Sequence, residues 1–86
     1  MVARDFLRVV PLAFGDRPYT VSGNQVLLTE GASRLEILLT ERPPRELGPT
    51  VRVPVLQVEM TFSSYSEDER AAFMTRFDRY FLRAGG

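Results

Sequence analysis

The sequence predicts an α+β fold, in which an antiparallel meander sheet of four to five strands carries one C-terminal α-helix on one face. Apolar segments with strand-like patterns fill the first three quarters of the chain, turn residues separate them, and the last quarter has helical apolar spacing. The 86 residues fit a single domain, with a strand-rich part at 6–62 and a helix at about 67–83. A bent half-barrel closed by the helix is the alternative fold.

The first expected strand runs from Phe6 to Phe14, where both alternating sets of positions carry apolar side chains. Pro11 predicts an edge or a bulge within it, because proline donates no hydrogen bond to a neighbouring strand. A hairpin is expected next, with strands at 19–21 and 25–29. Its turn is Ser22-Gly23-Asn24, since glycine and asparagine both accept positive φ.

Residues 34–41 alternate as a strand does, and the apolar face that we expect to meet the helix consists of Leu35, Ile37 and Leu39. Leu38 is the apolar exception on the opposite face. Three prolines and a glycine in residues 42–50 predict a stiff crossover loop rather than a regular element.

The longest expected strand covers residues 51–62. Its apolar side chains change parity between Pro54 and Leu56, which predicts a β-bulge and a kink at that point. Met60 and Phe62 are the side chains of this strand that we expect to contact the helix.

The helix start has a specific signal. Ser66 and Glu69 form a capping-box pattern, in which each side chain can bond to the backbone amide of the other residue. The acidic run from Glu67 to Glu69 suits the positive end of the helix dipole, so we interpret it as structural rather than as a metal site. The stripe expected to cover the sheet comprises Phe73, Phe77, Tyr80, Phe81 and Ala84.

The composition argues against catalysis. Cysteine, histidine and lysine are absent, which removes thiolate chemistry, the usual general base at neutral pH and Schiff-base chemistry. We therefore expect a protein that is not an enzyme, with no catalytic residue, no metal ion and no cofactor.

The net charge and the hydropathy of the chain indicate which partners and which cellular location to expect. Basic and acidic residues number 11 each, so the net charge of zero argues against a generally basic nucleic-acid-binding protein. All basic residues are arginine, which we attribute to codon usage in a GC-rich genome. No segment has the pattern of a membrane span or a signal peptide, so we expect a cytoplasmic protein without nucleic-acid or membrane partners.

A flank of arginines lies beside the aromatic stripe of the expected helix, formed by Arg76, Arg79 and Arg83. Spacings of three and four residues make their guanidinium groups neighbours. Structural partners for them would be the strand carboxylates Glu36, Glu41 or Glu59. An anionic ligand or an acidic patch on another protein is the functional alternative, which makes an anion-binding module one candidate function.

The chain ends Leu82-Arg83-Ala84-Gly85-Gly86, and this C-terminal Gly-Gly resembles the tail of ubiquitin-like and sulfur-carrier proteins. The resemblance implies a terminal carboxylate that is adenylated and then attacked by a thiol or sulfide. The alternative is a helix cap, because glycine at a helix C-terminus adopts the left-handed conformation easily.

The function that we expect is that of a small non-catalytic accessory protein acting through protein–protein contact, either with another protein or with its own copy as a homodimer. One helix covers only one face of a sheet, so apolar residues on the other face need a second cover. The residues expected to form that interface are Leu7, Val9, Leu38, Val53 and Val55.

Overall fold

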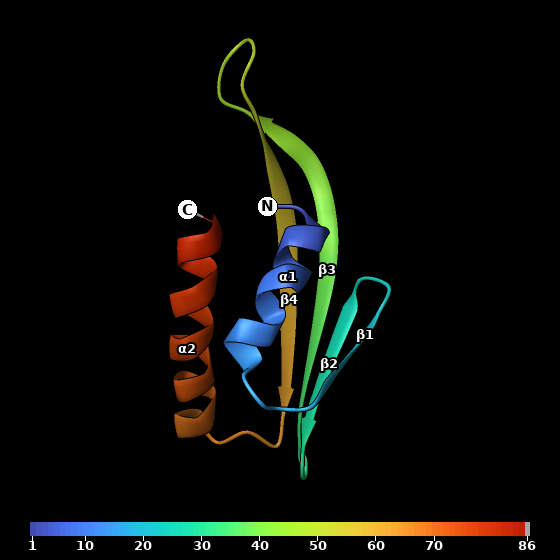
Figure 1. Ribbon diagram of the computed structural model, residues 1–86, viewed down its shortest axis with the longest axis vertical. Helices are drawn as coiled ribbons and strands as arrows, with labels where there is room; N and C mark the ends of the chain where they lie inside the picture. Colours follow the sequence, from blue (N-terminus) through green and yellow to red (C-terminus); the bar gives the residue numbers. More distant parts are fainter. Residues whose placement is uncertain (86) are drawn as a thin grey trace.

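The structure is a computed structural model that describes the backbone of residues 1–85 and the side chains of residues 1–81. It confirms an α+β fold with a four-stranded antiparallel sheet, but it contains two helices instead of the expected one (Figure 1). The elements in order are α1 (Ala3–Phe14), β1 (Tyr19–Ser22), β2 (Gln25–Glu30), β3 (Ser33–Glu46), β4 (Arg52–Ser63) and α2 (Glu67–Gly85).

The segment expected as the first strand is helix α1, so that prediction was wrong. Its buried side chains are spaced at i, i+4, i+7 and i+8, which is the period of a helix: Phe6, Val10, Ala13 and Phe14. Pro11 lies on the exposed side of the helix, and its carbonyl accepts the hydrogen bond from Gly15 that closes the last turn. The sheet therefore begins only at Tyr19.

The sheet is a meander in the order β1-β2-β3-β4, as the sequence predicted. In the β1–β2 hairpin Ser22 lies opposite Gln25, which leaves a two-residue turn, and Gly23 there has φ of 60°. Leu38 lies opposite Glu59 of β4, and the ladder between β3 and β4 then continues beyond the end of β2.

The region expected as a crossover loop is largely strand. β3 runs through Pro43 and Pro44 to Glu46, and it pairs with β4 as far as the register Glu46 with Arg52. The register shift lies between Arg42 and Arg45 of β3, where two residues, Pro43 and Pro44, oppose the single residue Pro54 of β4. The bulge therefore lies at Pro54, close to the predicted place, but its extra residue is on β3 and not on β4.

We call residues 42–55 the arm. Both helices end short of it, and it projects from the rest of the molecule as a two-stranded ribbon (Figure 1). The molecule is accordingly elongated, measuring 49 × 24 × 20 Å. The N-terminal end of α1 lies at the base of the arm, where the Met1 ammonium donates to the Pro54 carbonyl at 2.8 Å and the Ala3 amide donates to Glu41 Oε1 at 3.1 Å.

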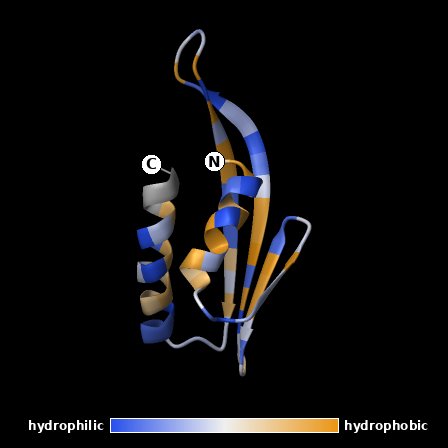
Figure 2. Ribbon diagram, viewed as in Figure 1, coloured by the Kyte–Doolittle hydropathy of each residue, from blue (hydrophilic) through white to orange (hydrophobic). Residues whose placement is uncertain are grey.

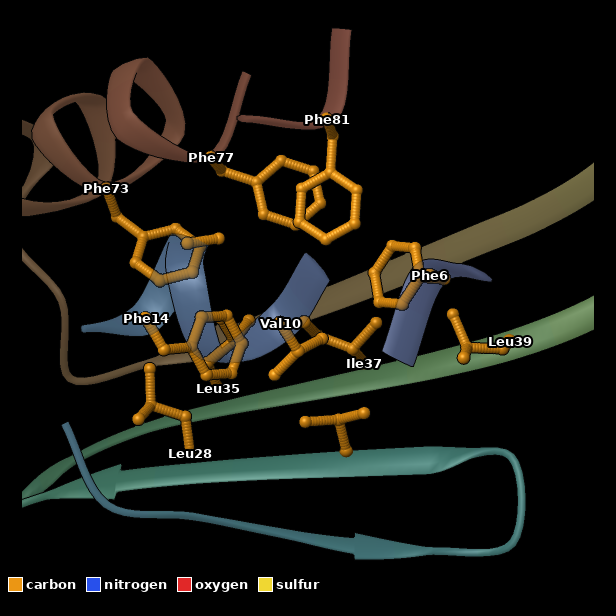
Figure 3. Close-up of a cluster of buried hydrophobic side chains, with 12 residues drawn as sticks. Phe6, Val10, Phe14, Leu28, Leu35, Ile37, Leu39, Phe73, Phe77 and Phe81 are labelled. Atoms are coloured by element: carbon orange, nitrogen blue, oxygen red, sulfur yellow. The ribbon is translucent and has the colours of Figure 1, made fainter. Parts of the chain in front are cut away.

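The core lies between the two helices and the inner face of the sheet (Figure 3). The sheet contributes alternate residues of its two central strands, and Leu35, Ile37 and Leu39 face the helices as predicted. The helices contribute five phenylalanines: Phe6 and Phe14 from α1, and Phe73, Phe77 and Phe81 from α2.

Helix α2 begins as the sequence predicted. The Glu69 amide donates to Ser66 Oγ at 3.1 Å, and the Ser66 amide donates to Glu69 Oε1 at 2.9 Å. These two bonds form the capping box. Phe73 of α2 contacts Phe62 of β4, with ring centroids 5.7 Å apart, so the expected contact of Phe62 with the helix is also present.

Candidate functional site

Arg76 of the predicted arginine flank has its hydrogen-bond partners at the C-terminal end of α1. Its Nε donates to the Ala13 carbonyl at 2.8 Å and its Nη2 donates to the Leu12 carbonyl at 3.2 Å. These carbonyls lack partners within α1, so the guanidinium satisfies them and also suits the negative end of the helix dipole. The guanidinium lies 5.5 Å from the ring centre of Tyr80.

The carboxylates expected to pair with this flank have other partners. Glu36 pairs with Arg34 at 2.7 Å, Glu41 accepts from the Ala3 amide, and Glu59 accepts from Gln57 at 2.6 Å. Arg79 is exposed, and the side chain of Arg83 lies outside the part of the chain that the structure describes.

An open pocket lies beside Arg76, where the loop after α1 meets the turn between β2 and β3. Its volume is about 550 Å³, and it is lined by Phe14, Gly15, Asp16, Arg17, Pro18, Glu30 and Arg76. Two arginines would suit an anion, but Asp16 and Glu30 line the same space, and Arg17 Nε already pairs with Glu30 Oε2 at 3.4 Å. Two carboxylates balance two guanidinium groups, so the local charge does not favour an anionic ligand.

A second cavity of about 240 Å³ shares Arg17 and Glu30 with the first and extends to the start of α2. Tyr65 lines it, and burial raises the pKa of its hydroxyl, with Arg17 acting in the opposite direction. Glu69 lines it too, and hydrogen bonds from Ser66 lower the pKa of that carboxyl. Both groups therefore keep their ordinary charge states near neutral pH.

The residues expected to form one apolar interface do not lie together. Leu7 and Val9 belong to α1 and pack against the core on the inner side of the sheet. Leu38 points to the outer face, where its cross-strand neighbours Gln25 and Glu59 are polar. That face carries alternating polar side chains, as the solvated face of an antiparallel sheet does.

Val53 and Val55 lie in the arm. Val53 is 39% exposed, and the arm carries two further exposed apolar side chains that sequence reasoning did not select, Leu47 at 63% and Val51 at 50%. The Leu47 amide donates to the Val51 carbonyl at 2.9 Å and closes the loop at the end of the arm. Figure 2 shows this apolar end well separated from the apolar residues between the helices and the sheet.

The remaining predicted features give no second site. Helix α2 includes Gly85, whereas a carrier tail requires extended glycines, and Gly86 lies outside the described residues. Among the described side chains, those of residues 1–81, no three that could ligate a metal ion gather in one place. None of the described helices has both the length and the apolar character needed to cross a membrane.

Comparisons with known proteins were made at three levels. No protein-family model, no curated protein and no solved structure matches this chain.

Proposed function

We propose that this protein is a non-catalytic binding module that docks onto another protein through its arm. The observation that carries the proposal is the position of Leu47, Val51 and Val53. They are the exposed apolar side chains at the end of a projecting ribbon, and none of them belongs to the core. Contiguous exposed apolar surface of this kind marks interaction sites.

The backbone of the arm supports docking by side chains. A two-stranded ribbon is only marginally stable in water without support. Prolines at 43, 44, 49 and 54 restrict the arm, which lowers the conformational entropy lost on binding. Proline also removes amide donors from the edges of the ribbon, so the arm is poorly suited to pair with a further strand.

The charges of the arm define the partner surface. Glu46 pairs with Arg52 at 3.4 Å. Arg42 and Arg45 form no ion pair with the carboxylates of the described residues, and both are exposed. The arm therefore fits an apolar groove bordered by acidic side chains, in which aliphatic anchors fill the groove and the arginines meet the rim.

Site-specific photo-crosslinking in the cells that make the protein tests this proposal. A photoreactive amino acid in place of Leu47 should give a discrete adduct. The same group in place of Thr20, which is exposed on β1, should give none. Val51→Ser with Val53→Ser should abolish the adduct and leave the melting temperature unchanged.

The mass of the adduct identifies the class of partner. An adduct of twice the chain mass means that the arm meets a second copy, and any other mass means a different protein. No adduct at Leu47, or the same adducts at Leu47 and Thr20, would contradict docking through the arm.

A further inference from the structure

The inner face of β4 is much less covered than the inner face of the two central strands. Val26 and Leu28 of β2 and Leu35 and Ile37 of β3 are all 0% exposed. The corresponding row on β4 is half-buried along its whole length: Leu56, Val58, Met60 and Phe62. Apolar surface therefore remains accessible along one side of the core.

The packing of α2 explains this difference. Phe77 and Phe81 turn toward Phe6 of α1, with ring centroids 6.0 and 4.4 Å from it. The aromatic contact from α2 to β4 is the pair Phe73 and Phe62. The aliphatic residues in the middle of β4 are only partly buried against the core.

The same strand is an edge of the sheet. β4 is the last strand in the order β1-β2-β3-β4. Between Val55 and Ser63 it contains no proline and a single charged residue, Glu59. Natural edge strands usually carry prolines, bulges or several charges that prevent pairing, and here the prolines are confined to the arm.

The hydrogen bonds of Leu39 show which amides face that edge. Its N–H donates to the Asn24 carbonyl and its C=O accepts from Asn24 Nδ2, both at 2.8 Å, so its backbone points toward β2. Backbone direction alternates along a strand, so Leu38 and Thr40 point toward β4, where they oppose Glu59 and Gln57. The free-edge amides of β4 therefore belong to the half-buried row: Leu56, Val58, Met60 and Phe62.

We infer that the β4 edge binds an extended polypeptide segment as a fifth strand of the sheet. Its alternate apolar side chains would cover the half-buried row, and its backbone would pair with the amides of the same residues. This is strand addition, in which main-chain hydrogen bonds give affinity and alternate side chains give specificity. The other side chains of the segment would lie beside Gln57, Glu59 and Thr61, so a basic residue opposite Glu59 fits best.

A second copy of this chain does not fit the edge. Figure 1 shows α2 to the side of β4 that is away from β3. Pairing two β4 strands about a two-fold axis would bring both α2 helices to the same place. Neighbouring strands lie about 4.8 Å apart, whereas packed helices need about 8–10 Å between their axes. The occupant is therefore a bare extended segment, and this second surface is independent of the arm.

A synthetic nine-residue peptide tests the inference, with valine alternating with threonine and one arginine. A peptide of the same composition with its valines grouped together is the control. Titration followed by NMR should show amide exchange slowed at least tenfold at Val58, Met60 and Phe62. Amides of β1, at the other edge of the sheet, should keep their rates.

Two variants make the test specific. Val58→Pro removes a free-edge amide without removing a bond to β3, as Pro54 already does in the same strand, and it should abolish peptide binding. Glu59→Arg is an exposed change that should weaken binding several-fold, and a peptide with glutamate in place of arginine should restore it. A chain with Leu47, Val51 and Val53 changed to serine should bind the peptide normally.

Equal binding of both peptides, unchanged amide exchange at millimolar peptide, or full binding by Val58→Pro would each overturn strand addition at β4. Those results would leave docking through the arm intact. Conversely, the absence of crosslinks from Leu47 would leave strand addition at β4 intact.

Discussion

Leu39 and Val53 are both apolar residues of the β3–β4 ribbon, yet they lie in opposite environments. Leu39 is buried beneath the helices, whereas Val53 lies in the arm, which no other element covers. In the body, side chains from two helices and the two central strands form the buried core. In the arm, the same two strands continue beyond both helices, and the N-terminus contacts only its base, at Pro54. The comparison separates apolar residues that hold the fold together from apolar residues available for binding.

The largest difference between the two regions should appear when an aromatic core residue is truncated. Phe6 stacks on Phe81 with ring centroids 4.4 Å apart, and it joins α1 to α2. Phe6→Ala should lower the free energy of unfolding by about 3–5 kcal/mol, because it leaves a cavity between the helices. Leu47→Ala in the arm should change it by less than about 0.5 kcal/mol.

Urea denaturation of both variants measures this difference. If Phe6→Ala is too unstable to purify, Ile37→Val should still cost about 0.5–1.5 kcal/mol. Equal losses from Leu47→Ala and Ile37→Val would contradict the division between body and arm.

A smaller effect is expected at the junction of the two helices. Arg76→Ala should lower the free energy of unfolding by about 1–2 kcal/mol, because two carbonyls at the end of α1 lose a charged donor near the surface. Arg79→Ala is the matched control on the same helix and should have almost no effect. Thermal unfolding of the two variants decides the point. An equal change in melting temperature for the two variants would show that the hydrogen bonds from Arg76 contribute nothing to stability.

The capping box should give a smaller effect again, together with a pH dependence. Ser66→Ala should cost about 1 kcal/mol, because the Glu69 amide loses its acceptor. The pKa of Glu69 in the folded protein lies below its ordinary value of 4.5 because Ser66 donates to the ionised carboxylate. The stability that ionised Glu69 contributes is therefore fully present at a pH above its ordinary pKa. This stability is lost as the pH falls through the lowered pKa of the folded protein.

The free energy of unfolding measured from pH 7 down to pH 3 tests the direction of this pH dependence. The parent should lose stability over the acid range by a larger amount than Glu69→Gln does. Parallel curves for the two proteins would show that the carboxylate adds no pH-dependent stability.

The sequence contained most of the fold because its local signals were specific. The Ser22-Gly23-Asn24 turn, the alternation of Leu35 to Leu39 and the Ser66–Glu69 pair each correspond to one structure, and all three are present. The error at Phe6–Phe14 arose because a short apolar run satisfies both a strand and a helix. The spacing of Phe6, Val10, Ala13 and Phe14 was the signal that identified α1.

The candidate site was less accessible to sequence reasoning. Arg76 bonds to carbonyls 63 and 64 residues away, and no spacing rule indicates that partner. The prolines of 42–50 suggested a loop, but the pairing of Arg45 with Val53 depends on register and extends the strands through them. The exposure of Leu47 and Val51 follows from this extension, because it carries them beyond the helices.

The central claim, that the outer part of the arm is dispensable for folding, is tested most directly by the unfolding free energy of a shortened chain. Residues 46–52 are replaced by Asn-Gly, and Val53 is changed to threonine. Arg45 and residue 53 are paired across the ribbon, so a two-residue turn can join them directly. The deletion removes Glu46 and Arg52 together, so the net charge does not change. The account predicts a folded protein within about 1 kcal/mol of the parent in urea denaturation. A loss of more than about 3 kcal/mol, or failure to fold, would show that the arm is part of the core structure and would contradict the account.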